Sequence, residues 1–193
     1  MIPSQTFRFP LRAAQKAGQL LASEWRLLSL RVLFPGFRAS GRNYIGPGCE
    51  IYLHRGSGIN LRGCHVSRGV TLTAGRGASL DLNQVYIGQY STIVARERVV
   101  VGCGTQIAER VSIRDANHDH SAPLTEGRFV SSPIDIGGDV WIGAGAAILA
   151  GVALGDRVTV GANAVVTRTA LSGTTVIGVP ALPLQARRGP NGD

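Results

Sequence analysis

An aliphatic residue returns at every sixth position through the second half of the chain. The series consists of Ile136, Ile142, Ile148, Leu154, Val160 and Val166. An amphipathic helix requires apolar residues three and four apart, and a half-buried strand requires them two apart. A six-residue period fits neither template and is typical of short strands and turns stacked in coils, as in a β-helix. We therefore predict an all-β solenoid.

In such a coil each hexapeptide forms one side of a triangular prism, so three hexapeptides complete one turn. Aliphatic residues eighteen positions apart should then stack, with Ile136 on Leu154 and Ile142 on Val160. Weaker and irregular repeats begin near Ile45. Because aliphatic side chains fill the interior, any chemistry must lie on the outside of the prism or in an extruded loop.

Residues 11–34 carry a helical pattern that ends at Pro35-Gly36. The apolar stripe of this helix consists of Leu11, Leu20, Leu21, Trp25, Leu28 and Val32, and the basic residues Arg12, Lys16, Arg26 and Arg31 lie off it. One interpretation is a cap that covers the open edge of the first coil. The other is a basic amphipathic helix that rests on an acidic membrane surface. The sequence leaves both open.

These patterns divide the chain into three parts. We expect an N-terminal helical cap over residues 1–40 and a β-helix domain over residues 41–185. A loop over residues 114–133 interrupts the repeats of this domain. Residues 186–193 are polar and contain glycine and proline, so we expect a flexible tail there.

Composition narrows the function classes and the location. The formal net charge is +8, but the basic residues are spread without aromatic interleaving, so no nucleic-acid partner is expected. The three cysteines form no C-x-x-C pair, which argues against a zinc site and fits a reducing compartment. The sequence has neither a signal-peptide pattern nor an apolar run near eighteen residues. We predict a cytoplasmic protein, placed peripherally at the inner membrane face if the helix binds lipid.

The loop concentrates the residues that can carry chemistry. Asp115, His118, Asp119 and His120 lie within six positions of one another. A neutral imidazole is the natural general base for a hydroxyl or an amine. Two histidines and two aspartates can also hold a metal, although a catalytic zinc needs three well-spaced protein ligands. An exposed polar loop with incidental histidines is the third interpretation.

The repeat block GGDVWIGAGAAILAGVALGDRVTVGANAVVTR resembles the acyltransferases of the hexapeptide-repeat superfamily, and among them it is most similar to the sugar O-acetyltransferases. The resemblance covers residues 40–185. It implies a left-handed parallel β-helix with an N-terminal α-helix and one extruded loop. It also implies a homotrimer in which acetyl-CoA, or another acyl-CoA, lies in a groove between neighbouring prisms. No metal is expected.

The resemblance also assigns roles to residues. His118, in Asn117-His118-Asp119, matches the loop histidine that takes the proton from the acceptor hydroxyl. The residues expected beside the acceptor are Asp115, Asn117, Asp119 and Trp141, and the family leaves open whether Asp115 or Asp119 orients His118 instead. The residues expected along the acyl-CoA are Ala144 and Ala162, through their backbone, and Thr167 and Arg168 near the end of the pantetheine arm. An indole packed against a neighbouring subunit is an equally good interpretation of Trp141.

Three functions follow from these observations. The first is an acyl-CoA-dependent acyltransferase that moves an acetyl group to a sugar hydroxyl of a polysaccharide or glycolipid precursor by direct attack. The second is a metalloenzyme similar to the γ-class carbonic anhydrases, although His118 and His120 lack the four-residue spacing of that class. The third is a non-catalytic β-helix scaffold.

Overall fold

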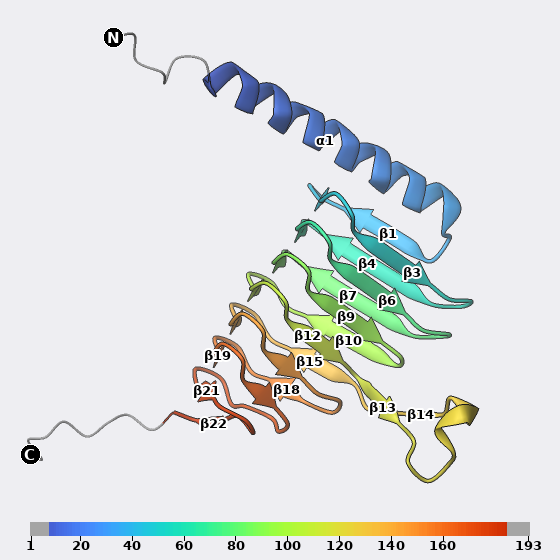
Figure 1. Ribbon diagram of the computed structural model, residues 1–193, viewed down its shortest axis with the longest axis vertical. Helices are drawn as coiled ribbons and strands as arrows, with labels where there is room; N and C mark the ends of the chain where they lie inside the picture. Colours follow the sequence, from blue (N-terminus) through green and yellow to red (C-terminus); the bar gives the residue numbers. More distant parts are fainter. Residues whose placement is uncertain (1–7, 185–193) are drawn as a thin grey trace, which may run out of the picture.

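A computed structural model describes residues 8–184 of the chain, with side chains described from residue 16 onward. Helix α1 (Arg8–Leu33) precedes a stack of short strands wound into a three-sided prism (Figure 1). Consecutive strands along the chain occupy consecutive sides, and each strand pairs with the strand one coil later. Nearly all of this pairing is parallel, as a coil that always turns the same way requires.

Each side of the prism is one sheet. Sheet A contains β1 (Phe37–Ser40), β4 (Gly58–Arg62), β7 (Ser79–Asn83), β10 (Arg98–Val101), β15 (Ile134–Ile136) and β18 (Ala153–Leu154). Sheet B contains β2 (Tyr44–Ile45), β5 (His65–Val66), β8 (Tyr86–Ile87), β11 (Gln106–Ile107), β16 (Trp141–Ile142), β19 (Thr159–Val160), β21 (Thr175–Ile177) and β22 (Leu182–Pro183). Sheet C contains β3 (Glu50–Leu53), β6 (Thr71–Ala74), β9 (Thr92–Ala95), β12 (Ser112–Arg114), β17 (Ala147–Ile148) and β20 (Val165–Val166).

The predicted aliphatic columns are confirmed. The register pairs Ile136 with Leu154, Ile142 with Val160 and Ile148 with Val166. All six side chains are almost completely buried. Burial of a side chain of this size contributes about 1.5–3 kcal/mol. The columns therefore hold the coils together, and the fold class expected from the six-residue period and the family resemblance is the one observed.

The coils near the N-terminus are longer than the eighteen residues that the period predicts. Val66 pairs with Ile45 above it and with Ile87 below it, which are steps of 21 residues. The reason is that sheets A and C contain strands of four or five residues here, as in β4 and β6. Longer sides displace the aliphatic residues from a strict six-residue step, which explains why the repeats are weak in this half of the sequence.

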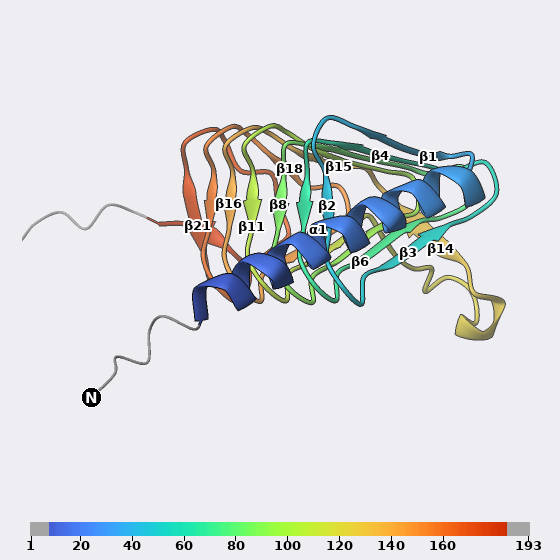
Figure 2. The same ribbon diagram turned by 90° about the horizontal axis from the view of Figure 1, so that it is seen from above.

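Helix α1 lies across the first coil (Figures 1 and 2). Leu27 is buried against this coil, and Leu30 and Phe34 pack partly buried beside it. Side chains of the helix also form hydrogen bonds with backbone groups at the free edge of the first strands. The Ser23 hydroxyl accepts a hydrogen bond from the Ile45 backbone N–H at 2.8 Å, and the Arg26 guanidinium donates to the Ile45 carbonyl at 3.0 Å. The helix therefore covers an edge that would otherwise be open to pairing with another strand.

The face that docks is not the stripe that the sequence predicts. Within the described side chains, the predicted stripe is exposed, with Leu21 at 67%, Trp25 at 71% and Val32 at 73%. The docking residues include Ser23 and Leu27, which follow stripe residues by two positions and so lie about 200° further around the helix. The prism therefore docks on a second face of the helix and leaves the stripe exposed, because the helix has apolar residues on two opposite faces.

The boundaries of the parts also differ in detail from the prediction. Strand β1 (Phe37–Ser40) pairs with β4, so the β-helix begins at residue 37 rather than at residue 41. The predicted flexible tail over residues 186–193 lies outside the described residues. No helix among the described residues is long and apolar enough to cross a membrane.

Candidate active site on the extruded hairpin

The extruded loop is a β-hairpin that leaves the prism at one corner. Strand β13 (Ala116–His118) pairs antiparallel with β14 (Phe129–Ser131), and a short 3₁₀ helix, η1 (Leu124–Glu126), lies in the connection. We call residues 115–132 the His118 hairpin. It starts where β12 of sheet C ends and returns where β15 of sheet A begins. The hairpin therefore projects from the corner between sheets A and C, well clear of the stacked coils (Figure 1).

Asp115 fixes the base of this hairpin. Its carboxylate is fully buried and accepts three backbone N–H groups, from Arg96 at 2.7 Å, Glu97 at 2.8 Å and Arg98 at 2.9 Å. Its own carbonyl accepts the Ser132 N–H at 2.8 Å, which closes the neck of the hairpin. A carboxylate with no accessible surface cannot contact a sugar. The prediction that Asp115 binds substrate is therefore wrong, and its role is to hold the neck in place.

His118 is exposed at the end of β13 farther from the prism and packs against an aromatic ring. Its register partner is Phe129, and the two ring centroids are 4.5 Å apart with the planes inclined at 36°. The Arg96 guanidinium carbon lies 4.0 Å from the centroid of the Phe129 ring, a cation–π contact. Phe129 therefore joins the imidazole to a guanidinium from the prism. Sequence reasoning missed Phe129 and Arg96, because only the hairpin register brings them to His118.

The other predicted loop residues lie apart from the imidazole. The Asp119 carboxylate accepts the backbone N–H and the hydroxyl of Ser121 in a local turn, and these bonds, the hydroxyl first, hold the pKa of Asp119 below its ordinary value. Within the described residues, neither Asp115 nor Asp119 hydrogen-bonds to His118. Asn117 is exposed, but adjacent side chains alternate along a strand, so it lies on the opposite face of β13 from His118. His120 is exposed in the connection.

The residues expected to line the acyl-CoA occupy two corners of the prism. Ala144 and Ala162 follow β16 and β19 at the corner between sheets B and C, one coil apart. A Cβ at Gly143 would lie 2.6 Å from the Ala162 nitrogen, so only glycine allows this close stacking. In the part of the chain that the structure describes, the N–H groups of Ala144 and Ala162 have no protein acceptor. They are therefore free to donate to a ligand carbonyl.

Thr167 and Arg168 lie at the corner that also carries the His118 hairpin. They follow β20 of sheet C and are exposed. The returning strand of the hairpin contacts the next coil at this corner, between β17 and β18, where the Ser132 carbonyl accepts the Gly151 N–H at 3.0 Å. The structure therefore brings the predicted base and the predicted end of the pantetheine site to one edge of the prism, with Ala144 and Ala162 on the other edge of sheet C.

Trp141 lies on a different side. It begins β16 in sheet B, where its indole is 59% exposed and its neighbours along the sheet are Gln106 and Thr159. Sheet B does not meet the corner from which the hairpin projects, and Figure 1 shows β19 and β21 of this sheet on the side away from β13 and β14. One prism therefore does not place Trp141 beside its own His118. If both serve one site, the two residues must come from different subunits.

A wide hollow lies away from the hairpin. It has a volume of about 1100 Å³ and lies between α1 and the outer face of sheet B, where Lys16, Arg42, Tyr44, His65 and Arg68 contribute to its lining. The His65 ring stacks between Tyr44 at 4.7 Å and Tyr86 at 5.1 Å, and burial lowers the pKa of His65. This hollow is wide and open, and none of the predicted site residues lines it.

Among the residues that the structure describes, no three His, Cys, Asp or Glu side chains gather into a group that could hold a metal ion. The histidines and aspartates of the hairpin point to separate places instead. The described residues of the hairpin therefore do not provide a ligand set for the metalloenzyme interpretation within one chain.

Comparison with known proteins agrees with the fold and the repeats. Residues 133–168 match the family described as bacterial transferase hexapeptide (six repeats). "Putative lipopolysaccharide biosynthesis O-acetyl transferase WbbJ" of Escherichia coli is 34% identical over 143 residues, which is 67% of this chain and 72% of that protein. "Nodulation protein L" of Rhizobium meliloti is 34% identical over 161 residues, which is 83% of this chain and 74% of that protein. "Galactoside O-acetyltransferase" of Escherichia coli is 31% identical, and the chain spans 52% of its length.

Two solved structures show the same architecture. AntD, an N-acyltransferase from Bacillus cereus in complex with dTDP and coenzyme A, has a TM-score of 0.68 and 20% identity over 82% of this chain and 88% of its own. The hexapeptide-repeat acetyltransferase VCA0836 from Vibrio cholerae, complexed with acetyl coenzyme A, has a TM-score of 0.59 and 19% identity. The match covers 96% of this chain and 92% of the Vibrio protein. At this level of identity the likeness establishes the fold of the present chain and nothing further.

Proposed function

Because this chain belongs to the hexapeptide-repeat family of acyltransferases, we propose that it transfers an acetyl group from acetyl-CoA to a sugar hydroxyl, with His118 as the general base. The observation that carries the proposal is the exposed imidazole on a hairpin anchored by a buried carboxylate. Relatives named as O-acetyltransferases support the reaction class. Neighbouring structures that contain coenzyme A or acetyl coenzyme A support the donor.

The reaction requires one proton to move at the imidazole. His118 accepts the proton of the acceptor hydroxyl as its oxygen attacks the thioester carbonyl carbon. The tetrahedral intermediate collapses with cleavage of the carbon–sulfur bond, and the CoA thiolate leaves with the proton that the imidazole returns. The products are an acetyl ester and free CoA. A backbone N–H near the thioester oxygen stabilises the oxyanion of the intermediate.

We further propose that each site is shared between two subunits of a homotrimer. Trp141 on sheet B cannot reach the His118 hairpin of its own chain, so it would meet the hairpin of a neighbour. The free N–H groups of Ala144 and Ala162 would hold the pantetheine amides between the two prisms. Arg168 would face the phosphates, where a fixed positive charge stabilises the bound nucleotide. Asn117, Asp119 and Trp141 are then candidates for acceptor contacts from either side.

The test uses radiolabelled acetyl-CoA with a panel of free sugars, galactosides and lipopolysaccharide oligosaccharides as acceptors. We expect labelled product and release of the CoA thiol that depend on both the acceptor and His118. Lability of the product in mild alkali identifies an ester, whereas a stable amide would indicate an amino-sugar acceptor instead. If the protein fails to bind acetyl-CoA in calorimetry, the assignment as a CoA-dependent enzyme is wrong.

A further inference from the structure

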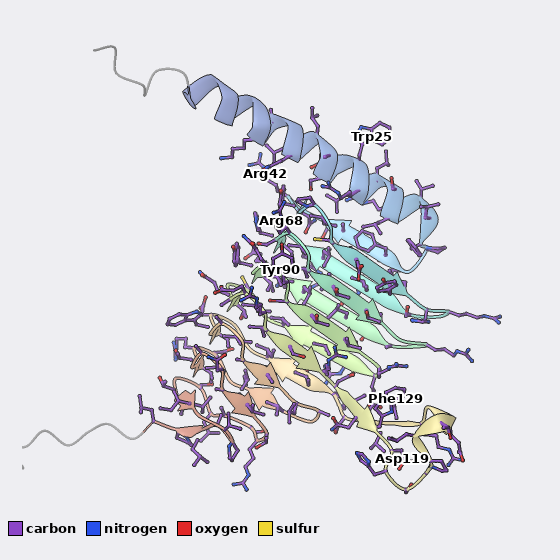
Figure 3. All side chains as sticks on the ribbon, in the orientation of Figure 1. Trp25, Arg42, Arg68, Tyr90, Asp119 and Phe129 are labelled. Atoms are coloured by element: carbon purple, nitrogen blue, oxygen red, sulfur yellow. The ribbon has the colours of Figure 1, made fainter. Side chains whose placement is uncertain are left out.

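The outer face of α1 carries a continuous apolar stripe that is largely exposed in the described part of the chain. It consists of Leu21, Trp25, Leu28 and Val32, spaced four, three and four residues apart, so they lie on one face of the helix. Their exposures run from 52% for Leu28 to 73% for Val32. In Figure 3 the Trp25 side chain points away from the coils. The docking face with Ser23 and Leu27 already fixes the helix to the prism, so the stripe is not needed for folding.

Solvent-exposed stripes of this size require an explanation. An isolated exposed leucine is ordinary, but contiguous large apolar side chains on one surface indicate an interaction site. Leu20 and Leu33 are also exposed, at 51% and 69%, on the flanks of the helix about 100° from the stripe. The stripe therefore presents a ridge of branched aliphatic side chains around one indole, which is the composition that helices use at a membrane interface.

The positive charge of the protein is concentrated at the same end. Residues 1–80, which comprise α1 and the coils next to it, contain eleven Lys and Arg and two Asp and Glu, a net charge of +9. Residues 81–193 contain nine basic and ten acidic residues, a net charge of −1. Arg31 and Arg38 are exposed near the helix, and Lys16 and Arg42 line the hollow between α1 and sheet B at the same end of the prism. The prism therefore has a strongly basic end that carries the apolar stripe and a nearly neutral end that does not.

We propose that this end of the molecule binds the surface of an anionic lipid bilayer. The stripe would enter the boundary between head groups and acyl chains, with α1 lying parallel to the membrane plane. The surrounding cations would face lipid phosphates, where each basic residue near an anionic surface adds to binding. Both faces of α1 are then used, one to close the prism and one to bind lipid.

Charge favours a bilayer over a second copy of this chain. Two copies joined through the stripe would bring two ends of net charge +9 against each other, and such like-charged surfaces repel. An anionic lipid surface is attracted by the same charge. The proposal does not depend on His118 or on acetyl-CoA, so it can fail while the proposed enzymatic activity stands. The hairpin would still lie close to a bilayer that the first coil contacts. Strand β12, from which the hairpin leaves, follows β3 by three coils in sheet C, which is about 15 Å at the usual strand spacing.

The experiment is vesicle flotation with the full chain. Vesicles of mixed phosphatidylglycerol and phosphatidylcholine are compared with vesicles of phosphatidylcholine alone. The test variant combines Trp25→Gln with Leu28→Gln. The matched control combines Leu171→Gln with Val179→Gln, which removes apolar side chains at least as exposed as those of Trp25 and Leu28, 75% and 72%, from the neutral end. All these residues are on the surface, so circular dichroism and thermal unfolding should show unchanged folds.

We expect the wild-type chain to float with the anionic vesicles and to be released at high salt, because screening weakens the attraction. The Trp25/Leu28 variant should bind at least about tenfold more weakly, since binding scales with buried apolar area. The control should bind like the wild type. In a Trp141→Phe background, Trp25 is the single tryptophan and its emission should shift to shorter wavelength on binding.

Three results overturn the proposal. The first is no flotation of the wild type with anionic vesicles. The second is equal flotation of the Trp25/Leu28 variant, which would assign binding to the basic surface without the stripe. The third is a smaller mass for this variant than for the wild type in lipid-free sedimentation, because the stripe would then be an interface between copies of the chain.

Discussion

Replacement of Asp115 tests whether the candidate site depends on a buried anchor. In the wild type one carboxylate oxygen accepts the Arg96 N–H, and the other accepts those of Glu97 and Arg98. In Asp115→Asn the amide oxygen can still accept the N–H groups of Glu97 and Arg98. The amide nitrogen then faces the Arg96 N–H, which loses its acceptor. A buried donor without a partner costs about 1–3 kcal/mol, so we expect a loss of about 2 kcal/mol in the free energy of unfolding.

Asp115→Ala should cost more. All three N–H groups lose their acceptor, and the neck of the hairpin loses the charge that holds it, so we expect a loss of about 3–5 kcal/mol, at the upper end of single-residue effects. The measurement is urea unfolding at one fixed protein concentration, because association contributes to apparent stability. Asp119→Asn is the matched control on the same hairpin. Its carboxylate is exposed and bonds only to Ser121, so its unfolding midpoint should not move.

Activity separates an anchor from a substrate contact. A misplaced hairpin displaces His118, so Asp115→Asn should lower kcat for acetyl transfer while the dissociation constant for acetyl-CoA stays close to that of the wild type. If Asp115→Ala were as stable as the wild type and raised only the KM for the acceptor, the carboxylate would be a substrate ligand. The assignment of a structural role would then be wrong.

Other expected outcomes concern the base, the donor site and stability. His118→Ala should lower kcat by about 10²–10⁴ without loss of acetyl-CoA binding in calorimetry, whereas His120→Ala should lower kcat much less. Equal losses of kcat in the two variants would favour a metal site. Arg168→Ala should weaken acetyl-CoA binding about tenfold, the value of one charge-assisted hydrogen bond to a phosphate. Burial lowers the pKa of His65, so the unfolded chain takes up a proton first as the pH falls through 6.5. Stability should therefore be full at neutral pH and fall below it, and His65→Phe should show less of this fall in thermal unfolding.

The repeats could be predicted from sequence because one simple rule decides them. A column of stacked aliphatic side chains demands the same residue type at each coil, so the period of Ile136, Ile142 and Ile148 is visible without a structure. The first coils obey the same rule over 21 residues, and the longer sides of sheets A and C hide it.

The orientation of α1 could not be predicted in the same way. The helix carries apolar residues on two opposite faces, and the larger set, which includes Trp25, is the one that the prism does not cover. Which face docks is decided by the Ser23 hydroxyl and Leu27, which match the edge of the first coil. Contacts of that kind depend on tertiary geometry and leave no periodic signal.

The site shows the same contrast. His118 could be proposed from sequence because an imidazole in a break between aliphatic repeats stands out from its surroundings. Asp115 has the polarity of an exposed loop residue, so its burial on three backbone N–H groups was not evident. The contact of Phe129 with His118 depends on the hairpin register, and eleven positions of sequence separate the two residues.

Mixed trimers test most directly whether two subunits share each site. His118→Ala removes the base, and Ala144→Trp blocks the groove at the other corner of sheet C; each trimer alone should be inactive. Co-expressed with different tags and purified as mixed trimers, the two variants should recover about a third of the wild-type activity, because each mixed trimer has one interface of three at which an intact His118 meets an intact groove. Mixed trimers of confirmed composition with no recovered activity would contradict a shared site and place His118 and the groove within one chain.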